Sequence, residues 1–592
     1  MLLPLAAYQD LAAITVGGAL SVIAIAYTRR PWLRSTITYF TWSICAIFGF
    51  AAALNVIIFR QIQQPLTLQV IELTDHMHGI WTSFVAAFTA GNVALLVLAP
   101  VTVLALARLS TRYAATTVRG ALKFASRPML LGLLAIYIIG VHRWTTSPGV
   151  VVTPMRNPEW AFAKSFIPQG TPFAGVKFPV GYTSDFLPVA ERTQIATGNV
   201  GGAFVQTSST RRPLNVVMVV LESVGSRRLG LYGASYGDTP ELQRLASHAM
   251  VFDQIYASQP STSAAMAAFF CSVYPLLSNQ HVPNVATDIR LKSLPAVLDA
   301  RGYRTAFIHD GQLYYDHEGD FLSVHGFHRV DSSPQDFNAP RDSLLVPRLM
   351  RWIQQDRSRP FFATIWTQDT HHPYIPTTSI DYGVTDQTLN RYLNAIHEDD
   401  AIVVGALTDA LARAGLADDT LLVVSGDHGE AFGEHGNRIH GFTVFDEETR
   451  IPLLIVNPKL FANPVRSAEL GQQIDIAPTI LGLLGMTPPG GWQGTSLFSN
   501  ARTNRAYLFA SDAAWGLVDG RLKYIFDGKT QHYQVYDLAT DPHERRDLAA
   551  LPRYIEGAGQ ARQRLAAWDS FQNKYFKERI QDFRAPASLA KK

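Results

Sequence analysis

The sequence is poor in charged residues and in cysteine. Charged residues make up 17% of its 592 residues and apolar residues make up 47%, whereas an average soluble domain carries roughly 25% charge. The two cysteines, Cys45 and Cys271, are too few for a disulfide framework or a cysteine-rich zinc module. A net charge of only +3 excludes a nucleic-acid binder with a basic body. No nucleic-acid partner is therefore expected.

Charge and apolar residues are unevenly distributed along the chain. Residues 1–143 hold ten basic and three acidic residues, whereas residues 144–592 hold 41 basic and 45 acidic residues. Four apolar runs lie in the first segment, at about 11–28, 36–59, 80–107 and 128–143. Each run approaches the ~20 residues that a membrane-spanning helix needs. Since arginine-rich loops lie on the cytoplasmic side, we expect an integral, multi-pass anchor at 1–143 in the inner or plasma membrane, with everything after it on the outer face.

The remainder of the chain divides into three predicted segments. Residues 144–212 form a proline-interrupted linker outside the membrane, in which Pro158–Phe166 is expected to form a short helix at the membrane interface or on the next domain. From residue 213, short apolar runs alternate with helical patterns such as Leu389–Ala414. This alternation predicts a doubly wound α/β domain over 213–548, followed by a helical tail at 549–592. The predicted buried parallel strands are Asn215–Leu221, Tyr303–His309, Phe361–Thr367, Thr420–Ser425 and Ile451–Val456.

Polar side chains follow three of these predicted strands. Glu222 comes directly after the first strand, Asp369 to His372 follow the third, and Asp427-His428 follow the fourth. Ligands in such sheets bind beyond the carboxyl ends of the strands. Taken singly, Glu222 is consistent with a helix cap and Asp427-His428 with turn residues. Their joint occurrence at three strand ends favours a functional site.

A hydroxyl-rich segment provides a fourth candidate element. Pro260-Ser261-Thr262-Ser263 precedes an alanine- and phenylalanine-rich helix. The free N–H groups at a helix N-terminus favour an anionic phosphate or sulfate. Plain capping of the helix by serine or threonine is the alternative interpretation.

These segments resemble the sulfatase branch of the alkaline phosphatase superfamily. The matching segments, in order, are Leu221-Glu222-Ser223, Pro260-Ser261-Thr262-Ser263, His371-His372-Pro373-Tyr374, Ser425–Gly436, Gln473–Thr479 and Tyr536–Glu544. With the predicted membrane helices in front, the chain resembles the membrane-anchored members, namely lipoteichoic acid synthases, phosphoglycerol transferases and phosphoethanolamine transferases. The resemblance implies a bundle of about four transmembrane helices followed by an α/β/α domain with a mostly parallel central sheet.

The same resemblance implies a metal site formed by Glu222, Thr262, Asp427 and His428. Two carboxylates, a hydroxyl and an imidazole suit one Mn²⁺ or Zn²⁺ ion, with Mg²⁺ as a further alternative. The metal would lower the pKa of the Thr262 hydroxyl and so create an alkoxide nucleophile. Thr262 is therefore the expected catalytic residue.

Several histidines are expected to contact the substrate. The resemblance assigns His371 and His440 to the substrate phosphate or to the leaving group, and His372 is the rival of His371 for this role. His435 is expected to be exposed to solvent. Two further histidines are candidates for contacts with the substrate headgroup: His309 and His317.

The nucleophile position departs from the pattern of sulfate-ester hydrolases. Those enzymes oxidise a Cys or Ser in a Cys/Ser-x-Pro-x-Arg motif to formylglycine, an aldehyde that threonine cannot give. Ser258 begins such a motif, but Thr262 occupies the arginine position. We therefore expect a transferase that moves phosphoglycerol or phosphoethanolamine from a membrane phospholipid donor, through a phosphothreonine, to a glycan or glycolipid acceptor of the cell envelope. The alternatives are a sulfatase-like phosphodiesterase or sulfuric ester hydrolase with water as acceptor, and an inactive scaffold or lipid sensor.

Overall fold

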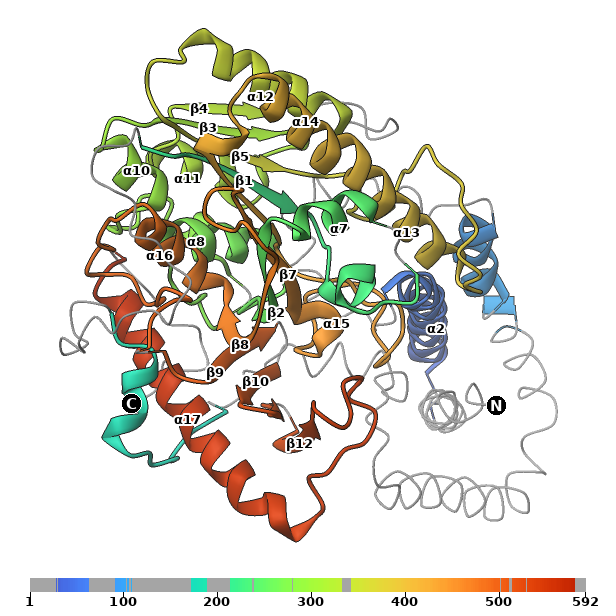
Figure 1. The fold of residues 1–592 in the computed structure, drawn as a ribbon. Helices are drawn as coiled ribbons and strands as arrows, with labels where there is room; N and C mark the ends of the chain where they lie inside the picture. The colour runs from blue at the N-terminus through green and yellow to red at the C-terminus, as the bar shows by residue number, and fades with distance from the viewer. Residues whose placement is uncertain are drawn as a thin grey trace. The chain divides into compact units, whose positions relative to one another are not determined.

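The computed structural model describes most of residues 28–62 and 91–108, residues 172–188, and residues 213–580 except 237–238, 279, 333–341, 501, 511–513 and 529. These residues divide into two compact units. One unit contains the helix α2 (Pro31–Ile62). The other contains two β-sheets and the helices that cover them (Figure 1).

An eight-stranded sheet forms the centre of the larger unit. Its strand order is β4-β3-β5-β1-β6-β7-β2-β8. All neighbouring pairs are parallel except those of β7, which runs antiparallel to both β6 and β2. The strands are β1 (Asn215–Leu221), β2 (Ala249–Tyr256), β3 (Arg304–His309), β4 (Arg329–Ser332), β5 (Phe361–Trp366), β6 (Thr420–Gly426), β7 (Arg450–Val456) and β8 (Val465–Gln472).

The five predicted strands are present, each within one residue of its expected ends, as β1, β3, β5, β6 and β7. The prediction that β7 is parallel is wrong, because β7 pairs antiparallel with both neighbours. A continuous apolar run indicates that both faces of a strand are buried. Helices on the two sides of a sheet bury parallel and antiparallel strands alike. Strand direction could therefore not be inferred from the run.

Helices cover both faces of the sheet and make a three-layer α/β/α arrangement (Figure 1). Alternate residues of β1 lie in opposite cores: Val216, Met218 and Val220 in one, Val217, Val219 and Leu221 in the other. The first core includes α8 (Thr262–Cys271), α10 (Leu294–Asp299), α11 (Glu318–Val324) and α16 (Ile476–Leu483). The second includes α7 (Pro240–Ala246), α12 (Leu345–Gln355), α13 (Gln387–Asp399) and α14 (Ala406–Arg413). A π-helical segment, Asp400–Gly405, joins α13 to α14 within the predicted helix 389–414.

A second, antiparallel sheet follows the first along the chain, and the sequence reasoning did not anticipate it. Its strands are β9 (Arg505–Ala510), β10 (Ala514–Asp519), β11 (Leu522–Asp527) and β12 (His532–Asp537). The long helix α17 (Pro552–Lys577) packs on this sheet, with Trp515 of β10 meeting Trp568 of α17 edge-on at 5.9 Å between ring centroids. α17 lies inside the segment predicted as a helical tail. The predicted domain boundaries stay predictions.

The predicted transmembrane bundle is contradicted by the structure. Within the described residues, no helix is both long enough and apolar enough to span a bilayer. α2 coincides with the apolar run 36–59 and has 32 residues. The runs 11–28 and 128–143, and the helix expected at Pro158–Phe166, lie outside the described residues, and the run 80–107 is described only in part. The inferred membrane location and phospholipid donor therefore lose their basis.

Candidate active site

The carboxyl ends of three neighbouring strands form the floor of the candidate site. β1 lies between β5 and β6, so the residues after these strands meet at one edge of the sheet. The Glu222 amide donates a hydrogen bond to Thr367 Oγ1 at 3.0 Å, and the Ser223 amide donates to Asp427 Oδ1 at 2.8 Å. Ser223 holds a φ of 58°, an uncommon value for a residue with a side chain. The backbone after β1 is thus tied to both neighbouring strands.

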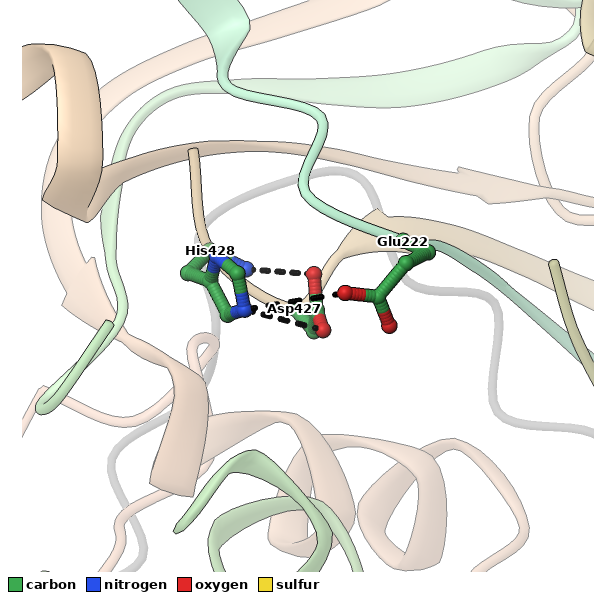
Figure 2. A group of neighbouring side chains, drawn as sticks. All are labelled: Glu222, Asp427 and His428. Atoms are coloured by element: carbon green, nitrogen blue, oxygen red, sulfur yellow. Dashed lines mark hydrogen bonds and ion pairs between the residues drawn. The ribbon is translucent and has the colours of Figure 1, made fainter. Parts of the chain in front are cut away.

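Four residues from three parts of the sequence converge at this edge. Thr262, the first residue of α8, places its hydroxyl 3.2 Å from Glu222 Oε1 and 3.4 Å from His428 Nε2. His428 Nε2 in turn lies 3.8 Å from Glu222 Oε1 and 3.4 Å from Asp427 Oδ2. Figure 2 shows the side chains of Glu222, Asp427 and His428 directed toward one another. Their ligand atoms all lie within 4.8 Å of one another.

The chemistry of this group fits a divalent cation. Glu222, Asp427 and His428 are almost completely buried, and Asp427 Oδ2 has no hydrogen-bond partner among the described residues. Burial raises the pKa of Asp427 to about 7, and burial together with His440 lowers the pKa of His428 to about 3. Buried carboxylates beside a neutral imidazole are costly unless a cation compensates them. His428 Nδ1 donates to the carbonyl of Gly429 at 2.9 Å, which leaves Nε2 as the nitrogen that faces the carboxylates.

Further hydrogen bonds hold the carboxylates in place. Trp366 Nε1, at the end of β5, donates to Glu222 Oε2 at 2.9 Å. Thr370 Oγ1 donates to the Glu222 carbonyl at 2.6 Å, and Gln473 Nε2 donates to the Asp427 carbonyl at 2.7 Å. Sequence reasoning missed Trp366, because its indole could be assigned to the apolar core as readily as to the site.

Two glycines allow the segment after β6 to lie close to its neighbours. A Cβ atom at Gly426 would lie 2.2 Å from the carbonyl oxygen of Val224, and one at Gly429 would lie 2.1 Å from the carbonyl oxygen of Glu447. A side chain at either position would therefore displace the backbone that carries Asp427 and His428. Packing thus explains the Gly-Asp-His-Gly sequence at this strand end.

Three other histidines lie beside this group to different extents. The His440 ring lies 4.1 Å from the His428 ring and 6.0 Å from the His371 ring, measured between centroids. Glu430 Oε2 contacts His440 Nδ1 at 3.1 Å and accepts a hydrogen bond from Tyr374 at 3.0 Å. Burial raises the pKa of Glu430 to about 7, and burial and His371 lower the pKa of His440 to about 4. The ring of His372 lies against Tyr374, at 5.4 Å between centroids. His371 and His440 thus lie together, and Glu430 is a further functional candidate.

The remaining predicted histidines lie outside the group. His309 is buried and contacts the carbonyl of Trp366 through Nδ1 at 2.9 Å. Trp366 is also the residue whose indole binds Glu222. The side chain of His317 is 60% exposed and lies 3.6 Å from Asp320. The expectation that His435 is exposed is wrong: its side chain is only 14% exposed and its ring stacks on Phe445 at 3.7 Å between centroids.

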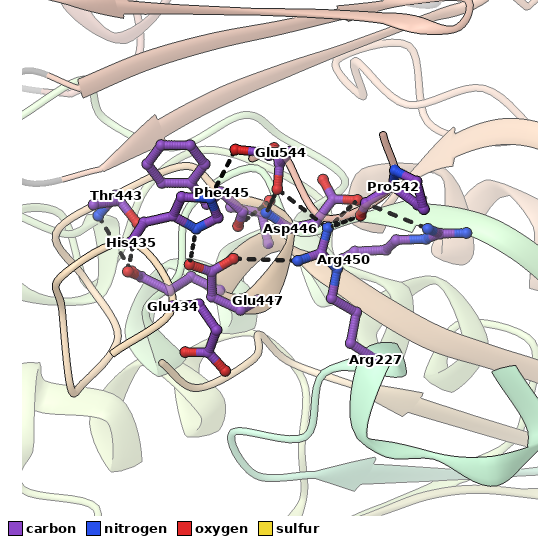
Figure 3. A network of polar contacts seen from close by, with 12 residues as sticks. Arg227, Glu434, His435, Thr443, Phe445, Asp446, Glu447, Arg450, Pro542 and Glu544 are labelled. Atoms are coloured by element: carbon purple, nitrogen blue, oxygen red, sulfur yellow. Dashed lines mark hydrogen bonds and ion pairs between the residues drawn. The ribbon is translucent and has the colours of Figure 1, made fainter. Parts of the chain in front are cut away.

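His435 belongs to an extensive network of buried ionic contacts (Figure 3). His435 Nδ1 contacts Glu447 Oε1 at 2.6 Å, and Arg227 lies 3.4 Å from Glu447 and 3.3 Å from Glu544. Lys523 Nζ of β11 lies 2.7 Å from Asp446 and 2.8 Å from Glu544. Burial alone would lower the pKa of Lys523, but these two carboxylates raise it. The network thus joins the second sheet to the segment 446–449 (α15).

Two family models match the larger unit. Residues 214–486 match the model described as "Sulfatase", and residues 433–570 match the model described as "N-sulphoglucosamine sulphohydrolase, C-terminal". A solved structure described as a protein in the alkaline phosphatase superfamily from Vibrio parahaemolyticus superposes with a TM-score of 0.52 at 19% identity, covering 70% of this chain and 95% of that one. Residues 214–486 therefore form a sulfatase domain with the alkaline phosphatase superfamily fold.

Curated relatives include both sulfatases and a synthase. Human N-acetylgalactosamine-6-sulfatase is 25% identical over 341 residues, which cover 48% of this chain and 64% of that protein. Lipoteichoic acid synthase 2 of Bacillus subtilis (strain 168) is 26% identical over 300 residues, covering 46% of this chain and 45% of the synthase. This chain thus matches less than two thirds of the length of either relative. Residues 214–486 are therefore similar to sulfatases, and these findings support the sulfatase-like hydrolase, which the sequence left as an alternative, better than the expected transferase.

Proposed function

We propose that this chain is a metal-dependent hydrolase that cleaves a sulfate or phosphate ester and delivers the acid group to water. The observation that carries the proposal is the Thr262 hydroxyl at the start of α8, 3.2 Å from Glu222 and 3.4 Å from the buried His428. The name of the human relative, N-acetylgalactosamine-6-sulfatase, makes an ester on a glycan the proposed substrate class.

Glu222, Thr262, Asp427 and His428 are the proposed ligands of the ion. A bound Mn²⁺ or Zn²⁺ would supply charge stabilisation for the Thr262 alkoxide and for the oxygens of the transferred group. The Thr262 proton passes to an adjacent acceptor, for which Glu222 is the nearer candidate at 3.2 Å. The first-turn N–H groups of α8 stabilise the anionic oxygens of the substrate, because they have no acceptor within the helix.

His440 is proposed to serve the second half of the reaction. Its Nδ1 is held by Glu430 at 3.1 Å, so Nε2 is the nitrogen available to the substrate. Because burial and His371 lower the pKa of His440 to about 4, the ring is neutral near pH 7 and can accept a proton from water. That water attacks the sulfur or phosphorus of the group carried by Thr262, whose oxygen then leaves. His371 is proposed to bind the anionic group.

The breakdown of the ester formed on Thr262 can be tested with isotope-labelled water. A threonine ester of sulfate has no second hydroxyl with which to expel sulfate, so its breakdown needs water at sulfur. We would incubate the full chain with Mn²⁺ in ¹⁸O-labelled water and offer an aryl sulfate or an aryl phosphodiester. The expected product carries one ¹⁸O atom in the released acid group.

Two variants identify the nucleophile. Thr262→Ala removes the attacking oxygen and should lower the rate by at least ~10³-fold. Ser258→Ala removes a buried hydroxyl from the same segment, one that has no hydrogen-bond partner among the described residues, and should leave the rate within about twofold. Loss of activity in Ser258→Ala but not in Thr262→Ala would overturn the assignment. Product that forms only when a sugar alcohol is added would overturn the hydrolase proposal in favour of transfer.

A further inference from the structure

A second cluster of nucleophilic and titratable side chains lies beside α8, and the proposed reaction does not use it. Ser261, the residue before Thr262, places Oγ 3.1 Å from Nε2 of His281. Nδ1 of His281 lies 2.6 Å from Oδ2 of Asp316. His281 and Asp316 are 6% and 4% exposed, whereas Ser261 is half-buried. The side chains of a partly exposed serine, a buried histidine and a buried aspartate thus form one chain of polar contacts.

The hydrogen bonds fix the tautomer that a serine nucleophile needs. The Asp316 carboxylate accepts from Nδ1, so Nδ1 carries the proton and the Nε2 lone pair faces Ser261. Nε2 of Gln259 also lies 3.4 Å from this nitrogen, and the serine contact is the shorter by 0.3 Å. His281 can therefore accept the Ser261 proton while Asp316 holds the ring.

The usual structural reason for a serine at this position is missing. Ser261 is the residue that precedes the first turn of α8, yet its side chain makes no capping hydrogen bond to that helix. Its carbonyl accepts from the amide of Ala265 at 2.9 Å, which leaves the amides of Thr262 and Ser263 without an acceptor in the helix. A nucleophilic serine followed by such amides is the arrangement that stabilises an oxyanion in serine hydrolases.

We propose that Ser261, His281 and Asp316 form a serine triad that cleaves carboxylic esters without a metal. Ser261 Oγ bonds to the carbonyl carbon while its proton moves to His281 Nε2, and the resulting oxyanion lies at the first-turn amides of α8. The C–O bond to the alcohol breaks, and the alcohol leaves with the proton from His281. Water then attacks the acyl-serine by the same route and releases the carboxylic acid. This activity does not depend on the proposed role of Thr262.

The test is covalent labelling of the full chain with an alkyl fluorophosphonate. Ser261 Oγ bonds to phosphorus, fluoride leaves, and the serine proton passes to His281, so the adduct mass can be located by peptide mass spectrometry. We expect the adduct on Ser261, with unchanged labelling when metal is removed by EDTA. Hydrolysis of 4-nitrophenyl acetate should be lost in parallel with labelling.

Variants separate a triad from a structural hydrogen-bond chain. His281→Gln should slow labelling by on the order of 10³-fold, and Asp316→Asn, which preserves side-chain shape, should also slow it strongly while the melting temperature stays close to that of the unmodified chain. Thr262→Ala should keep the Ser261 adduct. An adduct on Thr262 alone, no adduct on Ser261, or a labelling rate unchanged in Asp316→Asn would overturn the proposal.

Discussion

Metal binding at the proposed site should release a proton, and the size of this effect follows from Asp427. Burial raises the pKa of this carboxyl to about 7 in the metal-free protein, so the carboxyl is largely protonated at pH 6 and largely ionised at pH 8. A cation needs the ionised form. Lowering the pH from 8 to 6 should therefore weaken the metal affinity by about tenfold, and lowering it to 5 by about 90-fold.

The pH dependence of the metal affinity can be assigned to Asp427 by comparison with the neighbouring titratable groups. His428 should add little in this range, because burial and His440 lower its pKa to about 3 and the ring is already neutral. Glu430 supplies a matched control: burial also raises its pKa to about 7, but it is not among the proposed ligands. Glu430→Gln should therefore keep the pH dependence of metal binding, whereas Asp427→Asn should abolish it and weaken binding.

Isothermal titration of the metal-free chain with Mn²⁺ measures this coupling. Repeating the titration in two buffers with different enthalpies of ionisation gives the number of protons released, which should be close to one at pH 6 and about 0.1 at pH 8. An affinity that does not change between these two pH values, or proton release that persists in Asp427→Asn, would refute the reasoning.

Three further predictions concern stability and the nucleophile. Lys523→Met leaves the buried Asp446 and Glu544 carboxylates without their shared lysine and should lower the free energy of unfolding in urea by about 3–5 kcal/mol. The control is Lys459→Met, which removes a partly exposed ion pair and should cost less than ~1 kcal/mol. Equal losses in the two variants would argue against a stabilising role of the network. Burial raises the pKa of Asp569 to about 6, so the folded protein loses stability as this carboxyl ionises, when the pH rises from below its unfolded pKa through about 6. Asp569→Asn should therefore raise the free energy of unfolding by up to ~3 kcal/mol at pH 8, and by progressively less toward pH 4. A gain that does not depend on pH would contradict this. Thr262→Ser keeps a hydroxyl and should hydrolyse the aryl sulfate or aryl phosphodiester faster than Thr262→Ala does. A serine variant as inactive as the alanine variant would argue against a hydroxyl nucleophile.

The residues at the sheet edge could be predicted because each follows a long apolar strand. β1 and β6 are buried along their whole length, so the ends of their apolar runs can be recognised in the sequence. Glu222 comes directly after β1, and Asp427 comes directly after β6. The structure brings these two residues together with Thr262 and His428, while their chemical roles stay predictions. Trp366 and Glu430 could not be chosen in advance. Their placement depends on strand register and on the packing of Tyr374 and His440, which no local pattern contains.

The larger errors have physical causes of the same kind. Each of the strands β9 to β12 contains partly exposed positions, whereas the predicted strands β1, β3, β5 and β6 are buried along their whole length. The strands of the second sheet therefore lack the continuous buried apolar run that marked the first sheet. The predicted membrane bundle came from counting apolar residues in runs, and the described helices do not reach the length and apolarity that a span requires. The burial of His435 arises from Glu447 and Phe445, contacts that only the tertiary structure supplies.

The most direct test of the proposed function is to capture the covalent intermediate on Thr262. The full chain with Mn²⁺ would be mixed with an aryl sulfate or an aryl phosphodiester, quenched in acid within the first turnover, and digested for peptide mass spectrometry. The account predicts a sulfo or phosphoryl adduct on Thr262 that disappears in Asp427→Asn and decays as free acid accumulates. Turnover with no adduct on Thr262, or with the adduct on Ser258 or Ser261, would contradict it.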